Sequence, residues 1–417
     1  MPYDNSAVRR QDRLLDEARA RELLGGLPER IEVLLSANIL KNAMGVGIPG
    51  TGMIGLPIAV ALGAQIGRSE YGLEVLRDVT PEAVARARDY LAADAVSVAL
   101  KEGISETLYV EVHCTAGGRR AEAVIAGSHT RFVYLACDGE VVLDRRTGAS
   151  SREEEPCVPL TLRRVFDYAL TAPIDELAFI DEARRLNMAA AELALGGEYG
   201  HSLGRTLRGR RELHVMGDSL FSRMLAYTSA ACDARMAGAM VPVMSNSGSG
   251  NQGIAATVPV AVYARQTGAS EERTRRALVL SHLTAIYIKQ SLGRLSALCG
   301  CVVAATGSSC GIAYLMGGGY REVVCAVQNM IANLTGMICD GAKPSCALKV
   351  SSGVSTAVMS ALLAVEGKCV TSAEGIIDDD VDRSIRNLTA IGREGMAATD
   401  RLVLDIMTHK KPADCGR

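Results

Sequence analysis

Residues 107–146 read TLYVEVHCTAGGRRAEAVIAGSHTRFVYLACDGEVVLDRR, and this stretch decides the fold class. Apolar and polar residues alternate along it, which places successive side chains on opposite faces of a half-buried strand. Glycines interrupt the alternation where turns between strands are expected. Together with VSVALKEG at 96–103, the stretch predicts a β-meander of three to five strands over residues 96–146.

Regular patterns flank the meander on both sides. The segment Ile31–Leu40 is typical of a strand. Helical periods precede the meander at 11–24, 56–67 and 81–93, and follow it at 161–171, 174–195, 270–290, 321–337, 352–365 and 379–410. We therefore predict an α+β fold. An N-terminal α/β domain with an antiparallel sheet would span residues 1–158, and a larger all-α domain would span residues 159–417.

The composition excludes several classes of protein. The chain has 417 residues, twelve cysteines, a formal net charge of −2 and no long basic run, so we expect neither nucleic acid nor a membrane as partner. The charged first twenty residues lack the apolar core of a secretory signal, so we expect a cytoplasmic protein with free or metal-bound thiols. The uncharged stretch 295–320 could span a bilayer by length, but its Ser, Thr and Gly residues favour a helix buried in protein. Such Gly-rich apolar helices are compatible with a homodimer.

A glycine-rich loop at Asn246–Ile254, NSGSGNQGI, is the first candidate binding site. Its glycines allow backbone N–H groups to point at a ligand, and its Ser, Asn and Gln side chains add donors that suit a carboxylate or a phosphate. It lacks the Gly-Lys-Ser/Thr of a Walker loop and the glycine spacing of a dinucleotide fingerprint. The alternative is a turn that joins two buried helices.

Two further segments carry groups that could act on a substrate. The loop at 41–52, KNAMGVGIPGTG, lets a ligand approach its backbone closely, and Lys41 could pair with a carboxylate. The alternative is a structural loop with a solvated lysine. His129 lies between two hydroxyl residues in GSHT and could be an acid or a base, or an ordinary residue of a strand.

The cysteines are concentrated toward the C-terminal half. Cys299 and Cys301 occur in LCGC, and Cys339 and Cys346 in CDGAKPSC. Neither spacing fits a zinc ribbon. Thiolates beside glycine turns at the ends of apolar helices suit a buried iron–sulfur cluster. The alternative is that these residues are small apolar core residues.

Several long strings in the chain resemble signatures of the L-cysteine desulfidases, which are related to the iron–sulfur L-serine dehydratase alpha chains. These strings are NILKNAMGVGIPGTGMIGLPIA at 38–59, GSHT at 127–130, SAACDARMAGAMVPVMSN at 229–246, SNSGSGNQGI at 245–254, SHLTAIYIK at 281–289, RLSALCGC at 294–301 and GMICDGAKPSCALKV at 336–350. The resemblance extends from about residue 29 to residue 410.

The resemblance implies a lyase that eliminates the β-substituent of L-cysteine or L-serine, giving pyruvate, ammonia and sulfide or water. A [4Fe–4S] cluster held by three cysteines would leave one iron open as a Lewis acid. The implied cluster ligands are Cys299 and Cys339, with Cys301 and Cys346 close by. The implied substrate-binding residues are Asn42, Gly50, Thr51, Asn246, Ser247, Gly248, Ser249, Asn251 and Gln252. The implied general base is Lys41, His129 or His282.

One departure from the family pattern concerns the third cluster cysteine. The family places it near the start of the chain, in a Cys-Thr-Glu-Pro signature, whereas the first cysteine of this chain is Cys114. Three explanations stay open: the protein begins further upstream, Cys301 supplies the third ligand, or the cluster is lost. In the last case the protein would be a non-catalytic binder of small molecules. A pyridoxal-phosphate lyase is disfavoured because no lysine lies in a recognisable Schiff-base setting.

Overall fold

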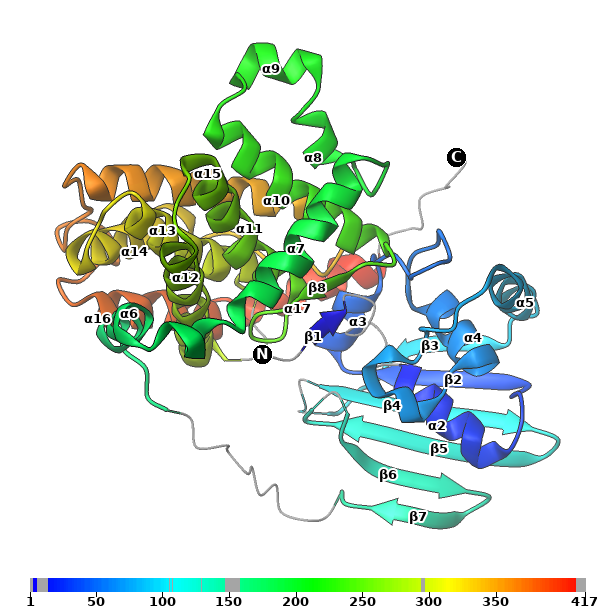
Figure 1. Cartoon of the computed structure of the whole chain (residues 1–417). Helices are drawn as coiled ribbons and strands as arrows, with labels where there is room; N and C mark the ends of the chain where they lie inside the picture. The colour runs from blue at the N-terminus through cyan, green and yellow to red at the C-terminus, as the bar shows by residue number, and fades with distance from the viewer. Residues whose placement is uncertain are drawn as a thin grey trace.

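The computed structural model describes residues 3–5, 14–104, 106, 108–128, 130–146, 158–293 and 297–409. Figure 1 shows a β-sheet with helices on one of its faces, next to a larger region built from helices. The α+β fold predicted from the sequence is therefore confirmed. The observed strands agree closely in length and position with the predicted strands, and the observed helices agree less closely with the predicted helices.

The N-terminal region contains the sheet and the helices that cover it. Its strands are β2 (Arg30–Leu35), β3 (Val96–Leu100), β4 (Tyr109–Ala116), β5 (Arg119–Ala126), β6 (Phe132–Cys137) and β7 (Glu140–Asp144). Its helices are α2 (Leu14–Leu24), α3 (Ala37–Ala43), α4 (Leu56–Ile66) and α5 (Pro81–Ala92), with a 3-10 turn at Ser69–Glu74. The hydroxyl of Thr80 caps α5 by accepting a hydrogen bond from the backbone N–H of Ala83 at 3.3 Å.

The six strands follow the order β3-β2-β4-β5-β6-β7. The strands β4 to β7 form an antiparallel meander as predicted. The prediction that residues 96–103 belong to the meander and that the sheet is antiparallel was wrong, because β3 pairs in parallel with β2, so the sheet is mixed. A parallel partner needs a crossover, and α4 and α5 supply it. The predicted strand Ile31–Leu40 was too long, because β2 ends at Leu35 and helix α3 begins at Ala37.

The two faces of the sheet differ in polarity. The side chains of Ile31, Val33 and Leu35 are fully buried on one face, toward α2 and α4. The register places Glu32 opposite His113, and His113 opposite Glu122, on the other face. This polar face is the one that no helix covers in Figure 1, as expected for a sheet with one side on the core.

The C-terminal region is a bundle of helices. Its elements are α6 (Leu162–Thr171), a 3-10 turn (Ile174–Leu177), α7 (Ile180–Leu195), α8 (Leu203–Thr206), α9 (Arg210–Met216), α10 (Leu220–Ala237), β8 (Pro242–Met244), α11 (Gly250–Thr267), α12 (Glu271–Leu292), α13 (Gly300–Leu315), α14 (Tyr320–Leu334), α15 (Cys346–Val365), α16 (Val381–Ala390), a π-helical turn (Ile391–Gly395) and α17 (Ala397–His409). Helix α13 contacts α11, α12, α14 and α15, so it lies at the centre of the bundle.

Helix α13 is buried along almost its whole length, which confirms the interpretation of 295–320 as a helix within a protein core where the structure describes it. A side chain at Gly307 would overlap the carbonyl oxygen of Ser281, so this glycine lets α13 approach α12 closely. Helix α15 is, among the described residues, the one long and apolar enough to cross a membrane by length and composition. Half of it is buried, and it packs against α10, α13 and α14.

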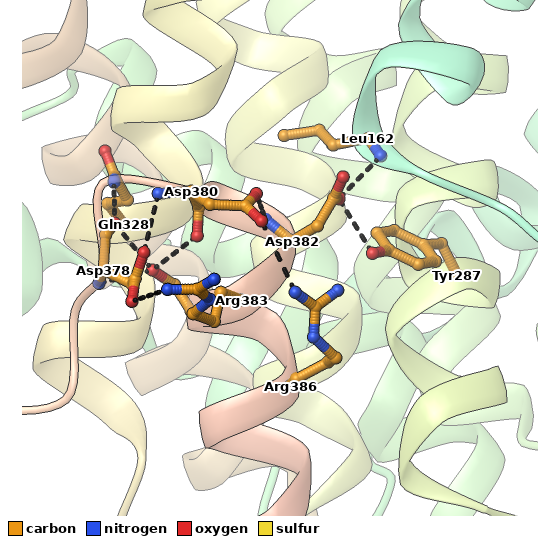
Figure 2. A network of polar contacts seen from close by, with 9 residues as sticks. Leu162, Tyr287, Gln328, Asp378, Asp380, Asp382, Arg383 and Arg386 are labelled. Atoms are coloured by element: carbon orange, nitrogen blue, oxygen red, sulfur yellow. Dashed lines mark hydrogen bonds and ion pairs between the residues drawn. The ribbon is translucent and has the colours of Figure 1, made fainter.

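A loop rich in aspartate ties four helices of the bundle together (Figure 2). The carboxylate of Asp382 accepts hydrogen bonds from the Tyr287 hydroxyl of α12 and from the backbone N–H of Leu162 at the start of α6, at 2.8 and 2.9 Å. The carbonyl of Asp378 accepts from the Gln328 amide of α14 at 2.9 Å. Asp380 caps α16. Because the carboxylates of Asp378, Asp380 and Asp382 all have hydrogen-bond partners, we interpret the cluster as one that joins helices.

The two regions meet around α3 and α17, which lie next to each other (Figure 1). All strands of the large sheet precede residue 159, and α6 follows it. The short strand β1 (Tyr3–Asn5) instead pairs antiparallel with β8 inside the helical region. The division into domains at residues 158 and 159 stays a prediction. The junction matters because the candidate site lies there.

Candidate active site

The loops that carry Cys299 and Cys339 are held together by backbone hydrogen bonds. Leu298 and Ile338 form an antiparallel bridge. The N–H of Cys299 donates to the carbonyl of Met337 at 2.9 Å, and the N–H of Cys339 donates to the carbonyl of Ala297 at 2.6 Å. The bridge therefore fixes the two cysteines that the sequence selected as the best metal ligands next to each other.

Three more thiols gather around this bridge. Cys299 and Cys301 are in hydrogen-bonding contact, and Cys346 is close enough to both to influence their ionisation. Cys232, from α10, is fully buried and interacts electrostatically with Cys346 and Cys299. The sequence did not single out Cys232, because its helix is buried on all sides and has no glycine turn beside it.

The ionisation of these thiols is set by burial and by one another. The Cys301 S–H donates to Cys299 and, with the nearby Cys301 N–H and Lys349, lowers the pKa of Cys299 to about 7 despite burial. Burial, reinforced by the negative charge of neighbouring thiolates, raises the pKa of Cys339, Cys346 and Cys232. Several thiolates can therefore coexist here only if a cationic centre binds them, as in a metal site.

Positive charge surrounds the thiols. Cys299 is the N-cap of α13 and Cys346 is the first residue of α15, so both lie at the positive ends of long helices. The Lys349 ammonium contacts the Asp340 carboxylate and donates to the carbonyl of Ile338 at 2.7 Å. Burial would raise the pKa of Asp340, but Lys343 and Lys349 outweigh it and hold that pKa at about 2. Such surroundings stabilise thiolates.

The Asn246–Gln252 loop is a tight turn that leads into α11. Asn246 and Ser249 exchange backbone hydrogen bonds, and both Ser247 and Gly248 have positive φ, as in a type I′ turn. Ser249 is the N-cap of α11 and accepts from the N–H of Gln252 at 3.4 Å. Ser247 is exposed at the tip, whereas Asn246, Asn251 and Gln252 are buried.

One buried amide of this loop, that of Gln252, lies next to the thiols. A side chain at Gly300 would come within 2.9 Å of the Gln252 amide, so Gln252 lies against the turn that joins Cys299 to Cys301. The Oε1 atom of Gln252 is buried and has no hydrogen-bond partner among the described residues. An unpartnered buried acceptor is costly, so we expect a ligand or water to satisfy it. Asn251 accepts from the Arg235 guanidinium of α10 at 3.2 Å.

His282 is part of a fully buried network of hydrogen bonds. Its Nδ1 lies 3.1 Å from the Asn246 amide nitrogen, and its Nε2 lies 2.8 Å from the Thr257 hydroxyl. The Thr257 hydroxyl donates to the carbonyl of Gly253 and accepts from Asn187, so Nε2 of His282 carries the proton and Nδ1 accepts. With both ring nitrogens engaged, His282 orients Asn246, and its predicted role as the base gains no support from this geometry.

The network makes stability depend on pH through His282. Burial lowers the pKa of this imidazole from 6.5 to about 4, so between those values the unfolded chain binds a proton that the folded protein does not. This contribution to the free energy of unfolding is present above pH 6.5 and should fall by roughly 1.4 kcal/mol per pH unit down to about pH 4. Urea unfolding at several pH values checks this. A His282→Gln protein should lack that part of the slope, and equal slopes would contradict the prediction.

The loop at 41–52 contacts the thiol site through its first residue. Lys41 is 2% exposed, and its ammonium contacts Asp400 of α17. Its positive charge favours the thiolate form of Cys339. A side chain at Gly45 would come within 3.1 Å of the Lys343 Cβ, so the loop packs on the Asp340–Lys343 turn.

The other residues of this loop that were predicted to bind substrate make contacts that stabilise the local backbone. The Asn42 amide donates to the carbonyl of Asn38 at 2.9 Å. The Thr51 hydroxyl donates to the carbonyl of Ile48 at 2.8 Å, and Gly50 has positive φ beside Val79. Their predicted binding of a carboxylate remains untested. His129 lies outside the described residues, so its role as a base also stays a prediction.

The donor set at this site fits an iron–sulfur cluster. Cys299, Cys301, Cys339 and Cys346 provide soft sulfur ligands; Cys339 is partly exposed and the other three are buried. Two helix N-termini and nearby lysines compensate the negative charge that such a cluster and its thiolates would bring. Cys232 enlarges the set from which a third ligand could come.

A second group of ligand-type residues lies on the polar face of the sheet, but it does not resemble a metal site. Glu111, His113 and Glu122 place ligand atoms within 4.8 Å of one another. The Lys101 ammonium is 2.7 Å from Glu111, and the Arg120 guanidinium is 2.9 Å from His113. Burial would raise the pKa of Glu111, yet hydrogen bonds from His113 and Lys101 hold it at about 2. Two cations already balance the two carboxylates, so we interpret this group as an ion-pair network.

Comparison with known proteins gives consistent matches. A family model described as serine dehydratase alpha chain matches residues 70–405, a range that contains all five thiols of the site and begins after Lys41. A UPF0597 protein of Bacteroides thetaiotaomicron is 69% identical over 393 residues, which is 94% of this chain and 92% of that protein. UPF0597 proteins of Phocaeicola vulgatus and Photobacterium profundum are 66% and 45% identical, over 94% and 95% of this chain and 92% and 93% of their own lengths.

Proposed function

Because the chain belongs to the UPF0597 family and, over residues 70–405, to the serine dehydratase alpha chain family, we propose that it is an iron–sulfur lyase. Its proposed reaction is the α,β-elimination of L-cysteine to pyruvate, ammonia and sulfide. L-Serine, which would give water in place of sulfide, is the second substrate to test. The family relationship is to lyases, and the choice of L-cysteine rests on the resemblance of the sequence to the L-cysteine desulfidases.

The observation that carries this proposal is the set of buried thiols next to an unsatisfied amide. Cys299 and Cys339 are joined by the Leu298–Ile338 bridge, and Gln252 lies against the same turn. A metal centre held by these thiols would therefore have a buried polar acceptor at its side. Polar groups of this kind fix the orientation of a small ligand such as an amino acid.

We assign a separate role to each side chain of this site. Cys299 and Cys339 would hold a [4Fe–4S] cluster, with a third ligand from Cys301, Cys346 or Cys232. When bound, the cluster supplies a Lewis acid for the departing β-substituent. The Gln252 Oε1 atom would accept a hydrogen bond from the substrate ammonium. The Lys41 ammonium would orient the carboxylate, and Asn246, whose amide donates to the imidazole and the carbonyl of His282, would hold the turn beside Gln252 in place.

Burial gives this arrangement its chemical effect. Interactions with developing negative charge are stronger in a site from which water is excluded. The nearby lysines and helix N-termini would stabilise the negative charge of a leaving thiolate. Removal of the Cα proton needs a base, and the predictions for Lys41 and His129 stay open to test.

Anaerobic purification followed by iron analysis and activity assays tests the proposal. We expect about three to four iron atoms per chain with matching sulfide, consistent with one cubane cluster, and release of pyruvate and sulfide from L-cysteine. L-Serine is assayed in parallel by ammonia release. A protein that holds no iron and shows no turnover after reconstitution would contradict the proposal. If that protein were stabilised against heat by L-cysteine, it would instead be the non-catalytic binder considered from the sequence.

Two further expectations accompany the proposed function. We propose a cytoplasmic location, because the reduced thiols required by the site persist in a reducing compartment. We also propose a homodimer, which light scattering of the purified protein tests directly.

A further inference from the structure

The C-terminal helix α17 reaches the candidate site through one side chain. Asp400, in the first turn of α17, forms an ion pair with Lys41, which lies 359 residues earlier in the chain. Figure 1 shows α17 beside α3, the helix that contains Lys41. The Lys41 side chain is 2% exposed and the Asp400 side chain is 25% exposed. The pair therefore joins a buried ammonium to a partly exposed carboxylate.

Lys41 is placed directly behind the loop that carries Cys339. Gly341 has a positive φ of 89°, and a side chain there would overlap the carbonyl oxygen of Lys41. The loop from Cys339 to Gly341 thus rests on the Lys41 backbone. The positive charge of Lys41 also acts on the Cys339 thiol. A shift of the Lys41 side chain would therefore change the electrostatic environment of Cys339, which we propose as a cluster ligand.

A buried ammonium needs a counter-ion. Of the residues that the structure describes, Asp400 is the carboxylate that reaches Lys41 within ion-pair distance. Removing one partner of a buried pair leaves the other charge uncompensated. Helix α17 itself contributes no buried side chain. Its other acidic residue, Asp405, pairs within the helix with His409 at 3.1 Å. The Asp400 contact is thus the specific link between α17 and the site.

We propose that Asp400 is a positioning residue of this enzyme: it holds the Lys41 ammonium beside the Cys339 loop, so that the C-terminal helix completes the site. This inference rests on the proposed function. The role of Asp400 is indirect, since it acts through Lys41 and does not touch the substrate. The pairing also explains why a helix without a buried face is docked at the junction of the two regions.

A double-mutant cycle tests the link in the full-length, cluster-loaded protein. Lys41→Met should lower kcat/KM for L-cysteine by about 100-fold through misplacement of the substrate, and mainly by raising KM. Asp400→Asn should give the same type of defect, about tenfold or more. The double variant should be no worse than Lys41→Met, because both changes remove one interaction. Asp400→Glu should recover most of the loss, and Asp405→Asn, on the same helix, should match the wild type.

Hydrogen exchange provides a readout that does not depend on turnover. Asp400→Asn should speed exchange in residues 37–44 and 339–343, and Asp405→Asn should not. Wild-type kinetics together with unchanged exchange in Asp400→Asn would overturn the inference and leave the proposed function intact. Additive effects of the two substitutions would also overturn it. If no variant, including the wild type, turns over L-cysteine or L-serine, the proposed function fails, and the catalytic part of this inference fails with it.

Discussion

Cys339→Ala is expected to abolish retention of iron and to lower the turnover of L-cysteine by more than about 100-fold. Loss of a group that only hydrogen-bonds to a metal ligand costs up to about 100-fold in activity, and loss of the ligand itself should cost more. The reason is that the Leu298–Ile338 bridge holds Cys339 diagonally across from Cys299, and no residue between Cys339 and Cys346 carries a thiol. The measurement is iron and labile sulfide per chain, made anaerobically, with the visible absorbance of the cluster as a second signal.

Cys310→Ala is the matched control for this change. Cys310 is fully buried, lies on α13 and donates weakly to the carbonyl of Thr306 at 3.3 Å, one helical turn away. We expect this variant to retain iron and activity with a modest loss of stability. Retention of iron by Cys339→Ala, or equal loss in both variants, would show that the cluster is held elsewhere or that the protein is merely sensitive to changes in its core.

Gly253→Ala is expected to destabilise the fold by about 3 kcal/mol, the upper part of the usual range for overpacking, because here the overlap is with backbone. Gly253 lies in the first turns of α11, and a Cβ atom there would overlap the carbonyl oxygen of Met244 in β8. Relief would require α11 to move away from β8 and would disturb the Asn246–Gln252 turn between them. Equilibrium urea unfolding measures the effect, and substrate affinity should fall with it.

Gly336→Ala separates this effect from the general cost of replacing glycine. Nothing lies within 4 Å of a Cβ at Gly336, and its φ is not in the left-handed region, so the change should be neutral within about 0.5 kcal/mol. A similar stability for Gly253→Ala and Gly336→Ala would mean that the contact between α11 and β8 is adjustable.

The site as a whole depends on contacts between segments that are remote in sequence. Lys41 comes from the sheet region, Gln252 and the thiols come from the bundle, and Asp400 comes from the last helix. Substitutions at the junction of the two regions should therefore affect turnover even where they do not touch the substrate. Asp400 is the case for which the structure allows the sharpest test.

The sequence by itself determined the elements whose pattern is local. The alternation in residues 107–146 predicted the strands β4 to β7, and the helical period at 81–93 predicted α5. It also selected Cys299 and Cys339, which the structure brings together, and the loop that contains Gln252. These features depend on residue type at short spacing, which a reader of the sequence can see.

Only the tertiary structure decided the features that join distant segments. Helices α10 and α11 were not predicted, because they are buried on nearly all sides and show no apolar stripe. The parallel pairing of β2 with β3, the presence of Cys232 among the thiols and the ion pair between Lys41 and Asp400 were equally invisible. The physical reason is the same in each case: a contact between remote residues depends on how whole elements pack, and the spacing of residue types along the chain carries no record of it.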